Sequence, residues 1–287
     1  MRIQAINPAN YARRRIFSAL MDLVCTLAAM MGLVFLALIL FTLIERGMAG
    51  FAPTIFTLPM RSEGGGLANA IIGTLLQTGV GILIGAPLGM AAGVYLAEVG
   101  RGSRLASIVR FVNDILLSAP SVLVGLFVYQ IVVIPMGAFS GLAGAVALAL
   151  LAMPVIARTT EDIIKLVPDS YREGSTALGA RDSTTISRVV VPAAFGGILT
   201  GILLAVARIS GETAPLLFTS FGNYGYSASF TSGGMASLPW AIYTYAKQPS
   251  NQLNNMAWTG ALVITGGVLM LNVLSRLSHF LVSRAGR

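Results

Sequence analysis

The sequence predicts an all-α membrane protein with six transmembrane helices and both termini in the cytoplasm. The first observation behind this prediction is composition: 55% of the 287 residues are hydrophobic, 10% are charged, and the mean hydropathy is +0.80. Such values argue against an ordinary soluble domain. The second observation is six apolar stretches close to the roughly 20 residues that a helix needs to cross a bilayer. The third is an alternation of basic and nearly uncharged connections between these stretches.

The six predicted spans follow one another along the whole chain. They cover residues 18–44, 67–96, 105–134, 141–157, 193–220 and 257–282. The first span is far longer than the apolar region of a signal peptide and lacks a small-residue cleavage site, so we expect it to be retained. The predicted organisation is a cytoplasmic tail, a first helix with its outer loop, a transmembrane core and a second cytoplasmic tail, at residues 1–17, 18–66, 67–282 and 283–287.

The distribution of basic residues assigns each connection to one side of the membrane. Four segments are rich in arginine and lysine, and these are expected to be cytoplasmic. Their basic residues are Arg2 and Arg13 to Arg15 before the first span, Arg101 and Arg104 after the second, five from Arg158 to Arg188 after the fourth, and Arg276, Arg284 and Arg287 at the end. The other connections hold only Arg46, Arg61 and Lys247. An even number of spans fits this result.

The second span carries small residues along one helical stripe. They are Gly73, Gly81, Gly85, Gly89 and Gly93, with Gln77 in the same four-residue phase. Such a stripe lets another helix approach closely. We therefore expect helix packing here rather than a substrate site.

Several function classes are disfavoured by the residues available. The formal charge is +8, but the 19 basic residues form no patch dense enough to bind nucleic acid. An ATP-binding loop of the form GxxxxGK[ST] needs a glycine before its lysine, and Lys165 and Lys247 follow Ile164 and Ala246. The single histidine, His279, offers little material for a metal cluster or a histidine-based triad. We expect no catalytic residues, no metal site and no cofactor bound by this chain.

The connection at residues 158–192 is too long and too patterned for a simple linker. Ser170 and Glu173 have the spacing of a capping box, Gly179 can end the short helix that follows, and Asp182 or Ser183 can cap a second helix. The segment is thus predicted to be a helix-turn-helix on the cytoplasmic surface. Its five basic and five acidic side chains are mixed, which favours docking to a protein over binding to lipid. A solvated surface helix is the alternative.

Part of this segment resembles the EAA signature of ABC importer permeases. The matching residues are Glu173-Gly174-Ser175, then Gly179, then Val189 to Pro192. Gly174 and Ser175 stand in place of the two alanines of the signature, which exchanges small residues for small residues. In that family the loop fits a cleft on the ATP-hydrolysing subunit and passes its motion to the membrane helices. The resemblance implies that the ATPase docks on Ser170, Glu173, Gly174, Ser175 and Gly179.

Three further strings resemble the PstA family of permeases from bacterial phosphate importers. They are "EGGGLANAIIGTLL" at 63–76, "RFVNDILLSAPSVLVGLFVY" at 110–129 and "ARISGETAPLLFT" at 207–219. The resemblance implies a type I ABC importer permease (MetI-like) fold in the bacterial cytoplasmic, or inner, membrane. It also implies a PstC-like sister permease, two copies of a PstB-like ATPase that uses ATP and magnesium, a PstS-like periplasmic phosphate-binding protein, and membrane lipid around the assembly.

Two other functions stay open at this point. One is the sister permease itself, or a permease for another oxyanion such as molybdate or phosphonate. The other is an ion-coupled secondary transporter, against which the EAA-like loop speaks.

Two charged residues lie inside the fifth predicted span, Arg208 and Glu212. An arginine at mid-membrane costs about 2.5–3.5 kcal/mol on insertion scales. At positions i and i+4 of one helix, the two side chains share a face and can pair. One hypothesis is a structural ion pair that locks two helices together. The other is a pathway site for an anion, in which the guanidinium binds phosphate oxygens, Glu212 keeps that binding weak, and Thr213 is a weaker candidate for the same wall.

A second charged pair lies near the cytoplasmic end of the third predicted span. Arg110 and Asp114 also have i, i+4 spacing. We predict a local ion pair at the membrane border here, with a gate as the alternative.

Overall fold

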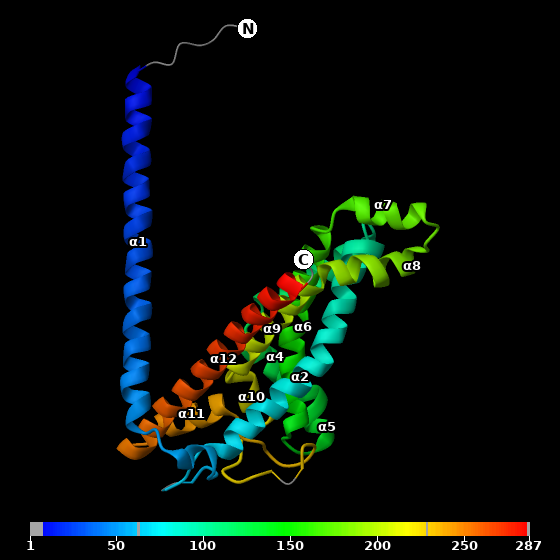
Figure 1. Ribbon diagram of the computed structural model, residues 1–287. Helices are drawn as coiled ribbons and strands as arrows, with labels where there is room; N and C mark the ends of the chain where they lie inside the picture. Colours follow the sequence, from blue (N-terminus) through cyan, green and yellow to red (C-terminus); the bar gives the residue numbers. More distant parts are fainter. Residues whose placement is uncertain (1–7, 62–63, 228, 286–287) are drawn as a thin grey trace.

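The computed structural model describes residues 8–61, 64–227 and 229–285, and this part of the chain is helical (Figure 1). The long helices are α1 (Pro8–Ala49), α2 (Ala68–Val94), α3 (Arg104–Ser118), α6 (Gly141–Lys165), α9 (Val191–Ser210) and α12 (Asn251–Ala285). The short ones are α4 (Ser121–Val128), α5 (Ile134–Met136), α7 (Asp169–Ala177), α8 (Asp182–Thr185), α10 (Ala214–Thr219) and α11 (Leu238–Ala246). A 3-10 turn, η1, spans Pro53–Phe56, and π-helical turns η2, η3 and η4 span Tyr95–Val99, Tyr129–Val133 and Ile186–Val190.

Within these described ranges, five helical segments are long and apolar enough to cross a membrane, and a bent pair makes a sixth. The five are Arg13–Ala49, Ala68–Val99, Gly141–Lys165, Asp182–Ser210 and Asn251–Val273. In the bent pair, Arg104–Ser118 and Ser121–Met136 meet at 105°. Residue 119, which precedes Pro120, has an extended backbone because proline disfavours the helical conformation of the residue before it. The third predicted span, 105–134, is therefore broken rather than continuous.

Helix boundaries differ from the predicted ones in four other places. Helix α1 begins at Pro8, inside the predicted tail, and α12 continues to Ala285, inside the other predicted tail. Residues 1–7 and 286–287 of those tails lie outside the described residues. Helix α6 runs on to Lys165, so the start of the predicted 158–192 loop is helical. The fifth predicted span, 193–220, is interrupted between α9 and α10.

The two ends of the described chain lie on the same side of the molecule (Figure 1). The beginning of α1, the end of α12 and the α7–α8 pair are at one end, while α11 and the 220–237 loop are at the other. This arrangement agrees with the predicted even number of spans and with a shared side for the termini and the 158–192 segment.

The closest helix packing is between α2 and α6, which we call the glycine seam. Four glycines of α2 face the backbone of α6: Gly81 lies near Ala145 O, Gly85 near Ala149 O, Gly89 near Met153 O, and Gly93 near Ala157 O. A Cβ added at Gly89 would lie 2.7 Å from Met153 O, and one at Gly93 would lie 2.6 Å from Ala157 O. The predicted helix packing is confirmed for these four glycines, whereas Gly73 of the same stripe faces Ala236 O in the loop before α11.

Among the described residues, helix α1 contacts the rest of the chain near its C-terminal end. There Thr259 of α12 donates a hydrogen bond to Gly47 O at 2.8 Å, and the Arg46 guanidinium lies 5.4 Å from the centre of the Trp258 ring. The apolar side chains from Ile16 to Ile39 are exposed, and Figure 1 shows the helix standing apart from the bundle.

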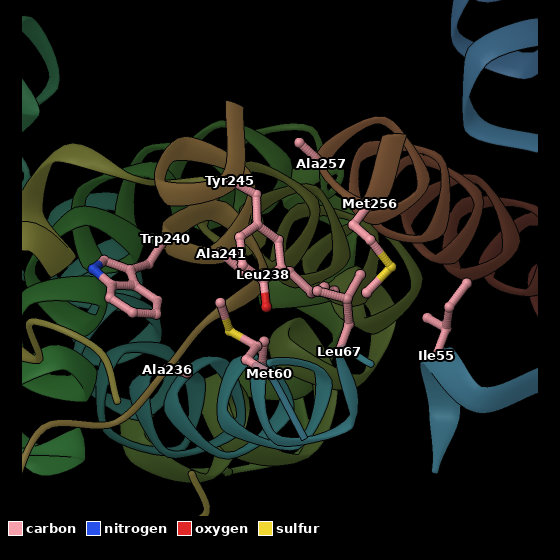
Figure 2. Close-up of a cluster of buried hydrophobic side chains, with 11 residues drawn as sticks. Ile55, Met60, Leu67, Ala236, Leu238, Trp240, Ala241, Tyr245, Met256 and Ala257 are labelled. Atoms are coloured by element: carbon pink, nitrogen blue, oxygen red, sulfur yellow. The ribbon is translucent and has the colours of Figure 1, made fainter. Parts of the chain in front are cut away.

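A separate cluster of buried side chains closes the end of the molecule opposite α7 (Figure 2). Leu67, Leu238, Tyr245 and Met256 bring together the start of α2, α11 and the start of α12. The Tyr245 hydroxyl donates to Arg61 O at 3.1 Å and accepts from Arg61 N at 3.2 Å. Burial raises the pKa of the Tyr245 phenol to about 12. This cluster therefore fixes the loop before α2 on the α11–α12 corner.

Candidate functional site

Arg208 lies in the last turn of α9, next to the break in this membrane span. Its side chain is exposed in the isolated chain, whereas Ala205 and Ile209 on the same helix are buried. A cation in the last turn of a helix is favoured by the carbonyl groups that end there. The arginine thus occupies an outward face of the chain at a position where the span is interrupted.

The predicted pair between Arg208 and Glu212 does not form. Helix α9 ends at Ser210, and Gly211 to Thr213 separate it from α10, so the i, i+4 geometry of a continuous helix is lost. Among the described residues, the ion pairs include neither Arg208 nor Glu212. Glu212 is partly buried, and Thr213 is the N-cap residue before α10 but makes no side-chain capping bond. Sequence spacing failed here because it assumed an unbroken helix.

The two broken spans pack against each other. Helix α4, which follows the bend at Pro120, lies against α10, which follows the break after Gly211. The contact is close: a Cβ added at Gly125 of α4 would lie 2.7 Å from the Cα of Pro215. Interrupted helices occur at membrane depth where they are buried in protein or line a water-filled cavity. The Arg208 region therefore has the backbone features of a site along a membrane path.

The chemistry available at this break is anion binding. The guanidinium remains charged at any physiological pH and presents a planar fork of N–H donors that matches phosphate or carboxylate oxygens. An arginine at membrane depth faces a bundle interior or a hydrated cavity, because lipid offers no acceptors for it. Since no partner for it lies within the described part of the chain, water, an anion or a neighbouring subunit must supply one.

The α7 segment forms a second candidate site at the other end of α6. Ser170, Glu173 and Gly174 are exposed on α7, as the predicted docking role requires. Ser175 instead turns inward and is hydrogen-bonded to Thr185 of α8 at 2.8 Å. This bond fixes the angle between the two arms of the helix-turn-helix.

The turn between α7 and α8 follows the prediction only in part. Gly179 has a φ of 79°, and its N–H donates to Thr176 O at 2.9 Å, so it ends α7 as expected. The predicted capping box is wrong, since α7 begins at Asp169 and Ser170 lies inside its first turn. Asp182 likewise lies inside the first turn of α8 instead of capping it.

Sequence reasoning missed the exposed apolar side chains of the segment from the end of α6 to the α7–α8 turn. Leu178 is 90% exposed, and Tyr171 and Leu166 are exposed as well. The sequence did contain one indication of this apolar surface, because Leu178 directly precedes the turn residue Gly179 in a segment otherwise rich in polar residues. Exposed apolar side chains next to Glu173 are suited to a pocket on another protein.

Arg110 and Asp114 are not partners, so the predicted local ion pair is wrong. The Arg110 Nε donates to Glu161 Oε1 of α6 at 2.8 Å, and its Nη2 donates to Leu96 O of η2 at 3.0 Å. Asp114 lies 3.8 Å from Arg158 Nη1 on the exposed surface. A buried carboxylate 51 residues away competes more strongly for the guanidinium than an exposed one on the same helix.

Arg172 of α7 points toward the membrane helices, whereas the next residue, Glu173, is exposed. Its Nη2 donates to Glu98 Oε1 of η2 at 2.6 Å, and its Nη1 donates to Val167 O at 2.7 Å. The hydrogen bond to Glu98 raises the pKa of the Arg172 guanidinium above its usual value. No sequence pattern indicated this contact, because its partners are 74 residues apart.

Comparison with known sequences identifies close relatives. The profile of the family described as "Binding-protein-dependent transport system inner membrane component" matches residues 85–285. The chain is 52% identical to the "Phosphate transport system permease protein PstA" of Yersinia pestis, over 88% of this chain and 87% of that protein. It is 51% identical to the protein of the same name in Haemophilus influenzae, over 88% and 89%.

Solved structures share the fold at low sequence identity. A chain of the MetNI methionine ABC transporter, in an inward-facing conformation, has a TM-score of 0.61 at 21% identity and covers 76% of this chain and 95% of its own. A chain of a bacterial ABC transporter involved in importing the acidic polysaccharide alginate has a TM-score of 0.62 at 16% identity, covering 94% and 99%. The predicted type I importer permease fold is confirmed.

Proposed function

The chain belongs to the PstA family of phosphate transport system permeases, and from this premise we propose that Arg208 contacts phosphate during its passage across the membrane. The chain is the permease subunit of an ABC importer and is not an enzyme; ATP is hydrolysed by a separate subunit. Its own task is to form part of the path and to respond to the ATPase.

The observation that carries the proposal is the exposed guanidinium at the interrupted fifth span. Arg208 has no acidic partner within the described residues, and the adjacent backbone is broken at Gly211. The energetic cost of such a cation falls when the face is hydrated and visited by an anion. Glu212 and Thr213 lie on the same short connection, where a nearby carboxylate limits how tightly phosphate stays bound.

The α7 segment is the docking site for the ATPase in this proposal. Glu173 and Gly174 are exposed on one face, and Leu178 extends beside them. A mixed surface of this kind fits a protein cleft better than it fits lipid. The inward hydrogen bond of Ser175 and the turn at Gly179 hold this surface in shape.

The expected assembly contains a PstC-like sister permease, two PstB-like ATPase subunits carrying ATP and magnesium, and a PstS-like periplasmic phosphate-binding protein. This chain binds no cofactor itself. The assembly lies in the bacterial cytoplasmic membrane, with the termini and α7 facing the cytoplasm. The family membership supports an ATPase and a substrate-binding partner, and co-purification from cells would identify the individual subunits.

Phosphate uptake by cells carrying variants of this chain tests the pathway role. Arg208→Ala is expected to lower uptake at least tenfold while the assembled complex is recovered in normal amount. Arg208→Lys keeps the charge but loses the planar fork, and we expect intermediate uptake. Competition with arsenate, sulfate and molybdate defines the anion class.

Two results would contradict the pathway role. Unchanged uptake with Arg208→Ala would show that the guanidinium does not serve the substrate. Loss of the sister permease from the purified Arg208→Ala complex would assign Arg208 to a structural ion pair between subunits instead.

A further inference from the structure

Two arginines join the cytoplasmic ends of α2 and α6 in a crossed arrangement, which we call the charged junction. Arg110 donates to the Glu161 carboxylate of α6 and to Leu96 O of η2, at the end of α2. Arg172 does the reverse. It donates to the Glu98 carboxylate of η2 and to Ile164 O at the end of α6, at 3.2 Å, and to Val167 O just beyond it.

Burial makes the junction costly to open. The side chains of Glu161, Glu98 and Arg172 are 2%, 9% and 15% exposed. Glu98 also lies 3.7 Å from Arg101, and Arg172 lies 3.0 Å from Asp169, but both of these second partners are exposed, so breaking the Arg172–Glu98 pair leaves two buried charges poorly compensated. The Arg172 contact is also directional, because Nε lies 3.2 Å from both oxygens of Glu98 while Nη2 lies 2.6 Å from Oε1. Arg172 and Glu98 therefore move together.

The Arg172–Glu98 pair connects a helix of the cytoplasmic segment, α7, to the end of a membrane span, η2. Arg172 belongs to α7, whose opposite face is the proposed docking surface, and Glu98 belongs to the π-helical turn that ends the second span. Single π-helical turns are rare, and they often occur at functional sites. A second one, Ile186–Val190, leads from the α7–α8 segment into α9 and thus toward Arg208.

We propose that the Arg172–Glu98 pair transmits movement of α7 to α2 and thereby sets how much phosphate is carried for each ATP hydrolysed. This inference rests on the proposed function. Arg172 and Glu98 are positioning residues. Their side chains are buried between α7 and α2, away from the proposed substrate path and the proposed docking face. The pair joins α7 to α2 by a buried charged contact, whereas the Ser175–Thr185 hydrogen bond joins α7 to α8.

The test measures ATP hydrolysis and phosphate uptake together in liposomes that contain the full purified complex and its binding protein. Glu98→Gln keeps the size of the side chain and removes its charge. We expect assembly and ATP hydrolysis to persist while phosphate carried per ATP falls at least fivefold. Asp162→Asn is the matched control, because Asp162 pairs with Arg158 on the exposed surface of α6, at 54% and 50% exposure. It should leave the ratio unchanged.

A covalent tether separates mechanical linkage from a general structural effect. In a Cys25→Ala background, Glu98→Cys combined with Arg172→Cys should also lower the ratio. A short bis-maleimide bridge between the two thiols should restore at least half of it, whereas complexes without the two engineered cysteines should not respond.

The outcomes are distinct from those that test the pathway. An unchanged ratio in assembled Glu98→Gln complexes would overturn the coupling role. If Glu98→Gln does not assemble, Arg172→Lys takes its place, and an unchanged ratio there, or a bridged double-cysteine complex that assembles and remains uncoupled, would also overturn it. Failure of the proposed function would appear instead as unchanged phosphate uptake in Arg208→Ala complexes, a result that leaves the effect of Glu98→Gln on the ratio untouched.

Discussion

The glycine seam and the charged junction hold the same two helices together by different forces. In the seam, α2 contacts the α6 backbone through glycines such as Gly85 and Gly89, with no ion pair between the described residues there. At the junction, four buried or half-buried charges replace these contacts. Lipid gives apolar helices no hydrophobic drive to associate, so the seam depends on close fit, while the junction borders water and depends on charge.

The seam is thus a rigid part of the molecule, whereas the charged junction is where other helices attach to it. The seam leaves no room for an added atom at Gly89 and Gly93 and little at Gly81 and Gly85, so we expect α2 and α6 to move as one body. The junction attaches α3 and α7 to that body through the ion pairs of Arg110 and Arg172. Each of these pairs can be weakened by a single substitution. Four substitutions rank these forces, each measured as the thermal unfolding of the purified complex in detergent.

The largest effect is expected in the seam, from Gly89→Leu. The first added atom would lie 2.7 Å from Met153 O and 3.0 Å from Ile156 Cβ, and the backbone carbonyl cannot move without separating the helices. We expect a loss of at least about 3 kcal/mol and little recovered complex. Gly79→Ala on the open face of α2, where nothing lies within 4 Å, should unfold like the unmodified complex. Equal stability of both variants would show that the seam is not closely packed.

Arg110→Met should produce the next largest effect, at the junction. It leaves the Glu161 carboxylate with Lys165 alone, at 2.6 Å. We expect a loss of about 1–2 kcal/mol, because Lys165 still compensates the charge and a fully buried pair would cost about 3–5 kcal/mol. The double variant Arg110→Met with Glu161→Gln should recover part of that loss. A double variant less stable than the single one would contradict this account.

Thr160→Val tests the point where seam and junction meet. The Thr160 hydroxyl is buried and has no hydrogen-bond partner among the described residues, while the Cβ and methyl group of this side chain lie against Gly93. Valine has the same shape without the unpaired polar atom, so we expect a gain of about 0.5–1 kcal/mol. Thr159→Val removes a hydroxyl that donates to Val155 O at 2.5 Å and should give no gain. Destabilisation by Thr160→Val would indicate that the hydroxyl binds an ordered water.

The smallest effect is expected from Asp162→Ala, which removes an exposed ion pair on the same helix. Arg158 Nε and Asp162 Oδ2 are 3.3 Å apart, and both side chains are about half exposed. Water and salt screen such pairs, so stability should stay within about 0.5 kcal/mol of the unmodified complex. A loss as large as that of Arg110→Met would mean that burial does not distinguish the junction from ordinary surface charge.

The seam was predictable from sequence, and the junction was not. Glycines at four-residue intervals in one apolar run define a helix face without reference to any other segment. The junction depends on Glu98 meeting Arg172 and on Arg110 meeting Glu161, 74 and 51 residues apart. Local spacing instead favoured Asp114 as the partner of Arg110, because spacing contains no information about burial.

The broken spans show a second limit of sequence analysis. Apolar length predicted six continuous helices and gave the number of spans correctly when the bent pair counts as one. Pro120 indicates a kink in the third span, and Gly211 and Pro215 indicate a loosened backbone in the fifth, but the sequence gives neither the 105° angle of the bend nor the end of α9 at Ser210. Both breaks follow from local backbone chemistry, a proline in one case and Gly211 in the other, but their consequence for Arg208 and Glu212 appears only in three dimensions.

The glycine seam also constrains how the chain is made. Its α2 half leaves the ribosome roughly 60 residues before its α6 half, a delay of roughly 3–12 s at about 5–20 residues per second. During that interval the glycines of the nascent α2 are exposed in the bilayer, and another membrane helix can pack against them in place of α6. Slower translation of the intervening segment would lengthen this exposure, and membrane quality-control proteases would then compete with α6 for the unfinished protein.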